Sequence, residues 1–207
     1  GDLFVESNEL FYVVLSDPSN AIVLDATGAC TIVNDDYPFI WTGGGGNGLA
    51  SNTNNWQWNG VKAVRVPTNQ DDIVLGPGGS SNLTWDAGVS GLTDTVNSWT
   101  QNSNYLGTVT FKTTYPEYSA AFTNFAILGN CILSNGVWTH LSNAGGANRR
   151  WYRLKVTMGG NLLLDSNATV NVAGLGYQSA SGPGNPGSHG GQRSQAGLRA
   201  SHVFRPC

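Results

Sequence analysis

The amino-acid sequence predicts an all-β protein, in which partial β-sandwich strands are followed by a right-handed parallel β-helix, or solenoid, with Gly-rich loops. Short runs of β-branched and aromatic residues recur between Gly, Asn, Ser and Pro residues. No segment keeps the i, i+3, i+4 apolar spacing of an amphipathic helix. Several runs lie about ten residues apart, which fits a sandwich, a barrel or a solenoid.

Composition divides the 207 residues into four parts. Residues 1–36 carry sandwich strands, residues 37–95 are a Trp/Gly-rich connector or solenoid cap, residues 96–180 are solenoid turns, and residues 181–207 are an irregular Gly-rich tail. The predicted strands are residues 10–15, 21–24, 29–33, 73–75, 107–113, 125–128, 131–133, 137–141, 152–158, 161–164 and 169–172.

The first 36 residues hold a dense motif. Asp2 and Glu6 precede an apolar strand, "LSDPSNA" follows it as a turn, and the segment closes on "TIVNDD". This pattern resembles the C-terminal part of a Calx-beta domain, a family of seven-stranded β-sandwiches of which some members bind calcium through acidic loops. The earlier strands of the family fold are not among these 36 residues, which by themselves are too few to close a sandwich core.

The resemblance implies a partial calcium site. Its ligands would be Asp2, Glu6, Asn34, Asp35 and Asp36, because Ca²⁺ takes six to eight oxygen ligands, many of them from carboxylates. The alternative is an acidic turn exposed to solvent. Three successive antiparallel strands would place the two acidic groups at opposite ends, whereas one strand interrupted near Gly28 would place them at the same end. Calcium binding requires the second arrangement.

The Trp/Gly-rich part reads "FIWTGGGGNGLASNTNNWQWNG" and later "VPTNQDDIVLGPG". It resembles an element that precedes β-helical repeats in large bacterial surface and autotransporter-like proteins. Four of the seven Trp residues lie here, at positions 41, 56, 58 and 85. Trp beside Gly-rich turns favours a cap over the end of a β core, and a sugar-stacking platform is the alternative. Asp71 and Asp72 fit a turn better than a cation site.

An internal repeat favours the solenoid. The segments "GNCILSNGVW" from Gly129 and "GNLLLDSNATVNV" from Gly160 share a Gly-Asn pair, an aliphatic run and a polar break before a second strand. Each unit would bury its aliphatic face by stacking on a neighbour. Two unrelated hairpins with the same turn chemistry are the alternative.

Charge is distributed unevenly. Residues 1–36 contain seven acidic residues and no Lys or Arg, whereas the part from Arg149 onward contains seven Lys or Arg residues and a single carboxylate, Asp165. The acidic end should attract cations. The basic end has little aromatic interleaving after Tyr152, so we expect no nucleic-acid partner. No apolar stretch is long enough to predict a membrane span. Cys30 and Cys131 lie in apolar runs typical of buried residues.

Enzyme signatures are sparse. G-x-S-x-G, H-E-x-x-H, P-loop and dinucleotide-binding motifs do not occur, and His140 reads as a strand residue. If the solenoid is catalytic, Glu117 and Asp165 are its candidate carboxylates. We therefore expect an extracellular or cell-surface adhesin-like protein that binds glycans or proteins, with calcium at its Calx-beta end. The alternative is a carbohydrate-active β-helix enzyme, a polysaccharide lyase or hydrolase, with an accessory Calx-beta module.

Overall fold

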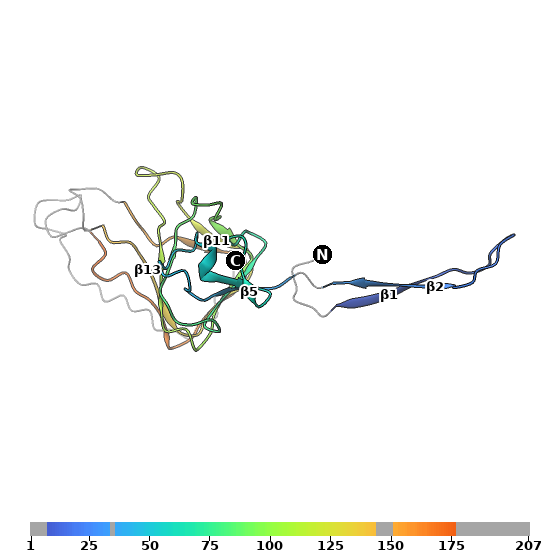
Figure 1. Cartoon of the computed structure of the whole chain (residues 1–207). Helices are drawn as coiled ribbons and strands as arrows, with labels where there is room; N and C mark the ends of the chain where they lie inside the picture. Colours follow the sequence, from blue (N-terminus) through green and yellow to red (C-terminus); the bar gives the residue numbers. More distant parts are fainter. Residues whose placement is uncertain (1–7, 34–35, 144–150, 177–207) are drawn as a thin grey trace, which may run out of the picture. The chain divides into compact units, whose positions relative to one another are not determined.

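The structure is a computed structural model that describes residues 8–33, 36–143 and 151–176 (Figure 1). The chain forms two compact units, Gly1–Tyr37 and Pro38–Cys207. The predicted all-β class is confirmed, since the described elements are strands apart from one short 3-10 turn, η1 (Thr53–Asn55). The predicted tail at residues 181–207 lies outside the described residues.

The first unit contains an antiparallel hairpin. Strand β1 (Glu9–Val14) pairs with β2 (Thr27–Ile32), so that Glu9 faces Ile32. The Leu15 amide donates to the carbonyl of Ala26 at 2.8 Å, which makes residues 16–25 the connecting loop. The strand predicted at residues 21–24 is therefore absent. The start of β1 and the end of β2 lie at the same end of the hairpin, as the calcium prediction requires.

Both faces of this hairpin are exposed. Every residue of β1 and β2 is exposed, and the apolar side chains of β1 alternate between the two faces. A two-stranded sheet cannot cover its own apolar faces, and the predicted sandwich stays a prediction for these strands. Cys30 is exposed with them, contrary to the expectation that it is buried.

The second unit is a parallel β-solenoid of about four turns. Its first sheet has the strand order β15-β12-β9-β6-β3-β4-β5, its second sheet β16-β13-β10-β7, and its third sheet β14-β11-β8. The bounds are β3 (Phe39–Trp41), β4 (Trp56–Trp58), β5 (Val61–Lys62), β6 (Asp72–Leu75), β7 (Leu83–Trp85), β8 (Thr95–Val96), β9 (Ser98–Gln101), β10 (Thr108–Phe111), β11 (Phe125–Ile127), β12 (Cys131–Leu133), β13 (Gly136–His140), β14 (Val156–Met158), β15 (Leu162–Leu164) and β16 (Ala168–Val170).

The turns stack in register. Strands β6, β9, β12 and β15 follow one another in the first sheet, and Trp99 pairs with both Ile73 and Cys131. The predicted repeat is confirmed as two stacked turns, because β12 pairs with β15 and β13 pairs with β16. Parallel pairing already begins where Phe39 meets Ile73, so the first solenoid strands lie within the range 37–95 that the sequence assigned to a connector or cap.

Aromatic side chains fill the solenoid interior. Trp41, Trp56, Trp85 and Trp99 are at most 1% exposed. Their rings meet edge to face, with centroids 5.0 Å apart for Trp41 and Trp56 and 5.7 Å apart for Trp85 and Trp99. This geometry suits the quadrupoles of the rings. The prediction that the Trp residues form a core or cap is confirmed for Trp41, Trp56 and Trp85, which leaves these three no exposed face for a sugar.

A structural cap covers the first turn. Strands β4 and β5 extend the first sheet in antiparallel pairing. Arg65 makes a two-pronged ion pair with the buried carboxylate of Asp71, at 2.6 and 2.7 Å, and its guanidinium lies 4.6 Å from the ring centroid of Phe39. The hydrogen bonds that Arg65 donates to Asp71 raise the pKa of Arg65. Thr68 donates to the same carboxylate, so Asp71 acts in the turn as expected.

Candidate functional site

The predicted calcium ligands fall mainly in segments that the structure does not describe. Asp2, Glu6, Asn34 and Asp35 lie outside the described residues, and Asp36 is half-buried. Within the described ranges no cluster of three His, Cys, Asp or Glu side chains forms a metal site. The start of β1 and the end of β2 lie at one end of the hairpin. The calcium site itself stays a prediction.

The structure does not bring the two candidate catalytic carboxylates together. Glu117 lies in the loop that joins β10 to β11, between the second and third sheets. Asp165 lies between β15 and β16, where the first sheet meets the second, and its amide donates to the carbonyl of Leu133 at 2.9 Å. The two residues therefore belong to different corners of different turns.

Other buried polar groups are held by structural partners. His140 ends β13 as expected, and burial lowers its pKa while its Nδ1 lies 2.7 Å from the carbonyl of Leu141. Cys131 is buried as expected, and burial raises the pKa of its thiol. The carboxylate of Asp72 accepts hydrogen bonds from Asn97 and Ser98 at 2.8 and 2.6 Å. The contacts of Asp72 join adjacent turns of the solenoid.

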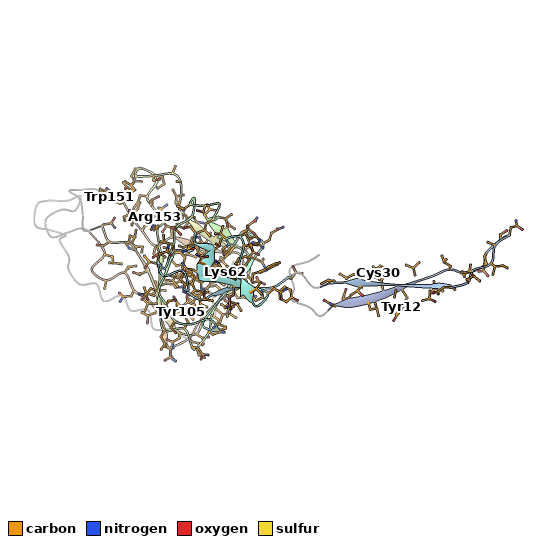
Figure 2. The ribbon with its side chains drawn as sticks, in the orientation of Figure 1. Tyr12, Cys30, Lys62, Tyr105, Trp151 and Arg153 are labelled. Atoms are coloured by element: carbon orange, nitrogen blue, oxygen red, sulfur yellow. The ribbon has the colours of Figure 1, made fainter. Side chains whose placement is uncertain are left out.

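On the outside of the solenoid, two loops from different turns pack on each other. The loop of residues 112–124 between β10 and β11 packs on residues 151–155, which precede β14, and together they are called the aromatic loop pair. Thr114 forms an antiparallel bridge with Tyr152. The Tyr115 amide donates to the Trp151 carbonyl at 3.0 Å, and the Arg153 amide donates to the Thr113 carbonyl at 3.1 Å. Figure 2 shows Trp151 and Arg153 close together, away from Tyr105.

Aromatic rings gather on this loop pair. The rings of Tyr118 and Trp151 are stacked, with centroids 5.0 Å apart and an interplanar angle of 13°. Tyr152 meets Tyr118 edge-on at 6.0 Å. Burial, together with the charge of Tyr118 and a hydrogen bond with it, raises the pKa of Tyr152. The guanidinium of Arg153 lies 4.8 Å from the ring centroid of Tyr115, in a cation–π contact.

Two residues fix the aromatic loop pair to the solenoid. Phe122 is 4% exposed and belongs to the core, so it anchors the first loop. Asn143 is buried, and its side-chain oxygen accepts hydrogen bonds from the amides of Trp151 and Tyr152 at 2.9 and 2.8 Å. Its side-chain nitrogen donates to the carbonyl of Tyr152 at 2.8 Å. The rings of Trp151 and Tyr152 are thus carried on a backbone that is held in place.

The aromatic loop pair also carries polar atoms without partners. Among the described residues, the buried side-chain atoms that lack a hydrogen bond are Asn124 Oδ1, Trp151 Nε1 and Arg153 Nε, and all three belong to this loop pair or flank it. An unsatisfied buried polar group costs about 1–3 kcal/mol, and such groups are rare in native structures. Their concentration here indicates a region that is not shaped by stability alone.

Sequence reasoning missed the aromatic loop pair. Its signals were the segments "TTYPEYSAAF" and "WYR", each of which reads as an ordinary strand or turn. Tyr118 and Trp151 belong to different turns of the solenoid, so only the stacking of turns places their rings together. The sequence favoured a core or cap for Trp41, Trp56 and Trp85, and these three residues are in the core.

The fold defines this chain as a parallel β-solenoid protein with a separate N-terminal hairpin unit. Comparison with family models, with curated proteins and with solved structures found no match. Among the residues that the structure describes, no helix is long and apolar enough to cross a membrane. The function must therefore be argued from the geometry of the chain itself.

Proposed function

We propose that this chain is part of a bacterial extracellular adhesin-like protein, in which the solenoid presents a binding surface to glycans or proteins at a cell surface. The observation that carries the proposal is the aromatic loop pair, where Tyr118 is 45% exposed although it is stacked on Trp151. Exposed aromatic side chains on an ordered support are typical of binding sites.

Adhesion is supported better than catalysis. Glu117 and Asp165 lie at different corners of the solenoid, whereas a glycosidase needs two carboxylates on either side of one bond. The described exterior is also rich in uncharged hydroxyl groups. Thr84, Thr110 and Thr139 lie side by side in the second sheet and are half-buried at outward positions. A polar surface with few charges suits an extracellular scaffold.

The test of this function is retention of the purified full chain on immobilised extracellular polysaccharides and matrix proteins. We expect saturable retention on at least one of these surfaces, at a level well above that on surfaces coated with albumin. Retention that is equal on all surfaces, or absent from all of them, would contradict the proposal. Release of reducing or unsaturated sugars during the incubation would instead favour the enzyme alternative.

The proposal includes calcium binding at the N-terminal end. The hairpin register supports it, because residues that precede β1 and residues that follow β2 flank the same end of the sheet. Asp2, Glu6, Asn34, Asp35 and Asp36 are the proposed ligands. Calcium would lessen the mutual repulsion of these carboxylates and so stiffen the end of the hairpin.

Calorimetric titration of the full chain with Ca²⁺ tests this site. We expect binding with a dissociation constant of about 10⁻⁴ to 10⁻³ M, the range of extracellular calcium modules, and at least tenfold weaker binding after the double change Asp35→Asn and Asp36→Asn. The matched control is Asp17→Asn with Asp25→Asn, which removes the same charge from the loop at the other end of the hairpin. Equal weakening of calcium binding by both double variants would indicate non-specific attraction and contradict the proposed site.

A further inference from the structure

We propose that the exposed face of Tyr118 is a stacking subsite for a pyranose ring of an acidic polysaccharide, one that contains uronate units. The inference rests on the proposed function, since it names the ligand and the location of the binding that an adhesin-like role requires. Its physical basis is one exposed aromatic ring, packed against fixed neighbours on a loop pair that carries three basic side chains and one carboxylate.

The geometry of Tyr118 leaves one ring face available. Trp151 covers one face at a centroid distance of 5.0 Å, and Tyr152 approaches edge-on at 6.0 Å. Tyr118 is nevertheless 45% exposed, so surface that the stacked Trp151 ring does not cover is open to solvent. A pyranose ring presents C–H groups on one side, and these pack on the negatively charged face of an aromatic ring.

The Tyr118 ring is held in its binding orientation before any ligand arrives. Its stacking on Trp151 and its edge-to-face contact with Tyr152 restrict its rotation. Asn143 fixes the backbone of Trp151 and Tyr152 through three hydrogen bonds of 2.8 to 2.9 Å. A side chain that is already ordered loses little conformational entropy on binding, so preorganisation of this kind favours affinity. Phe122 anchors the loop in the core.

The charge around the subsite favours an acidic chain. Lys112, Arg153 and Lys155 lie on or beside the aromatic loop pair, and Glu117 is its carboxylate. Lys155 is exposed, and Arg153 is half-buried above Tyr115, where its guanidinium also donates to the carbonyl of Thr123 at 3.0 Å. With three cations and one carboxylate, the aromatic loop pair should attract uronate groups more strongly than it repels them. Binding should therefore weaken as salt increases.

The experiment measures binding of hexagalacturonate and of cellohexaose to the full chain by calorimetry. We expect hexagalacturonate to bind more tightly than the neutral cellohexaose, with an affinity that falls when the salt concentration is raised. The change Tyr118→Ala should weaken hexagalacturonate binding at least tenfold, because it removes the stacking face. The change Tyr118→Phe keeps that face and should stay within about threefold of the unaltered chain.

The matched control is Tyr12→Ala in the hairpin, where the tyrosine is 59% exposed and carries no part of the proposed subsite. It should leave the affinity unchanged, and circular dichroism should show that all variants are folded. Unaltered binding by the Tyr118→Ala variant would overturn the subsite, and tighter binding of cellohexaose would overturn the acidic ligand. If the chain is retained on a polysaccharide or matrix surface but binds neither hexasaccharide, this inference fails while the proposed function stands.

Discussion

At the scale of single residues, Gln101 shows how a polar group is accommodated in the core. It lies between Leu75 and Leu133 in one inward-facing column of the first sheet and is 1% exposed. Its side-chain oxygen accepts hydrogen bonds from the indole nitrogens of Trp99 and Trp138, and its side-chain nitrogen donates to the carbonyl of Asn135 at 2.8 Å. One amide therefore satisfies two buried indole groups from adjacent turns.

Replacing Gln101 with leucine should lower the stability of the fold, even though leucine occupies both neighbouring positions of the column. Gln101→Leu leaves two indole N–H groups and one carbonyl without partners, and each unsatisfied buried group costs about 1–3 kcal/mol. We expect the free energy of unfolding to fall by about 3 kcal/mol or more, measured by urea denaturation monitored through Trp fluorescence. The control is Thr100→Val, on the outward side of the same strand, for which a change within about 0.5 kcal/mol is expected. A Gln101→Leu variant as stable as its control would show that these bonds contribute nothing net.

At the scale of elements, the Gly-Asn repeat marks the position where two turns lie in close contact. The Gly160 amide donates to the carbonyl of Gly129 at 3.0 Å, and the Asn161 amide donates to the side-chain oxygen of Asn130 at 3.0 Å. A Cβ atom added to Gly160 would lie 2.6 Å from the carbonyl carbon of Gly129. The glycine is needed because the backbones of adjacent turns approach too closely for any side chain.

This contact gives a prediction for the stacking of turns. Gly160→Ala should lower the free energy of unfolding by about 1–3 kcal/mol, because the backbone of the neighbouring turn must move to admit the methyl group. Gly176→Ala is the control, since a Cβ at that position meets nothing within 4 Å and should change stability little. Thermal melting of the full chain measures both. A loss that is equal for both variants would mean that the close approach does not limit the stacking.

At the scale of the whole molecule, the two units differ in how they are stabilised. The solenoid buries a continuous core that runs from Phe39 to Ala168, whereas every residue of the hairpin strands is exposed. The last described turn is intermediate between these cases. Its side chains, among them Leu162, Leu164 and Val170, line a cavity of about 220 Å³ together with Trp138. In a repeat fold each turn is stabilised by its neighbours, and among the described strands β14, β15 and β16 each pair with one neighbouring turn.

The sequence predicted much of this architecture where strands are apolar and the repeat is visible. The predicted strand at 131–133 matches β12, and those at 161–164 and 169–172 overlap β15 and β16. It missed β7, β8 and β9, which have two to four residues each and lie among polar and Trp residues. Such short strands contain too few residues to show a period of two. Their partners in adjacent turns define them, and those partners are distant in sequence.

The candidate sites also differ in whether the sequence alone could indicate them. The acidic residues at 1–36 are evident from the sequence because candidate metal ligands are proposed from residue type and local pattern. The aromatic loop pair was not predictable, since Tyr118 and Trp151 meet only through parallel stacking of two turns. The sequence by itself determined the all-β class, the repeat, the residue types of the core and the uneven charge. The tertiary structure alone decided which aromatic rings are buried and which are exposed, because parallel pairing depends on contacts between residues far apart in the chain.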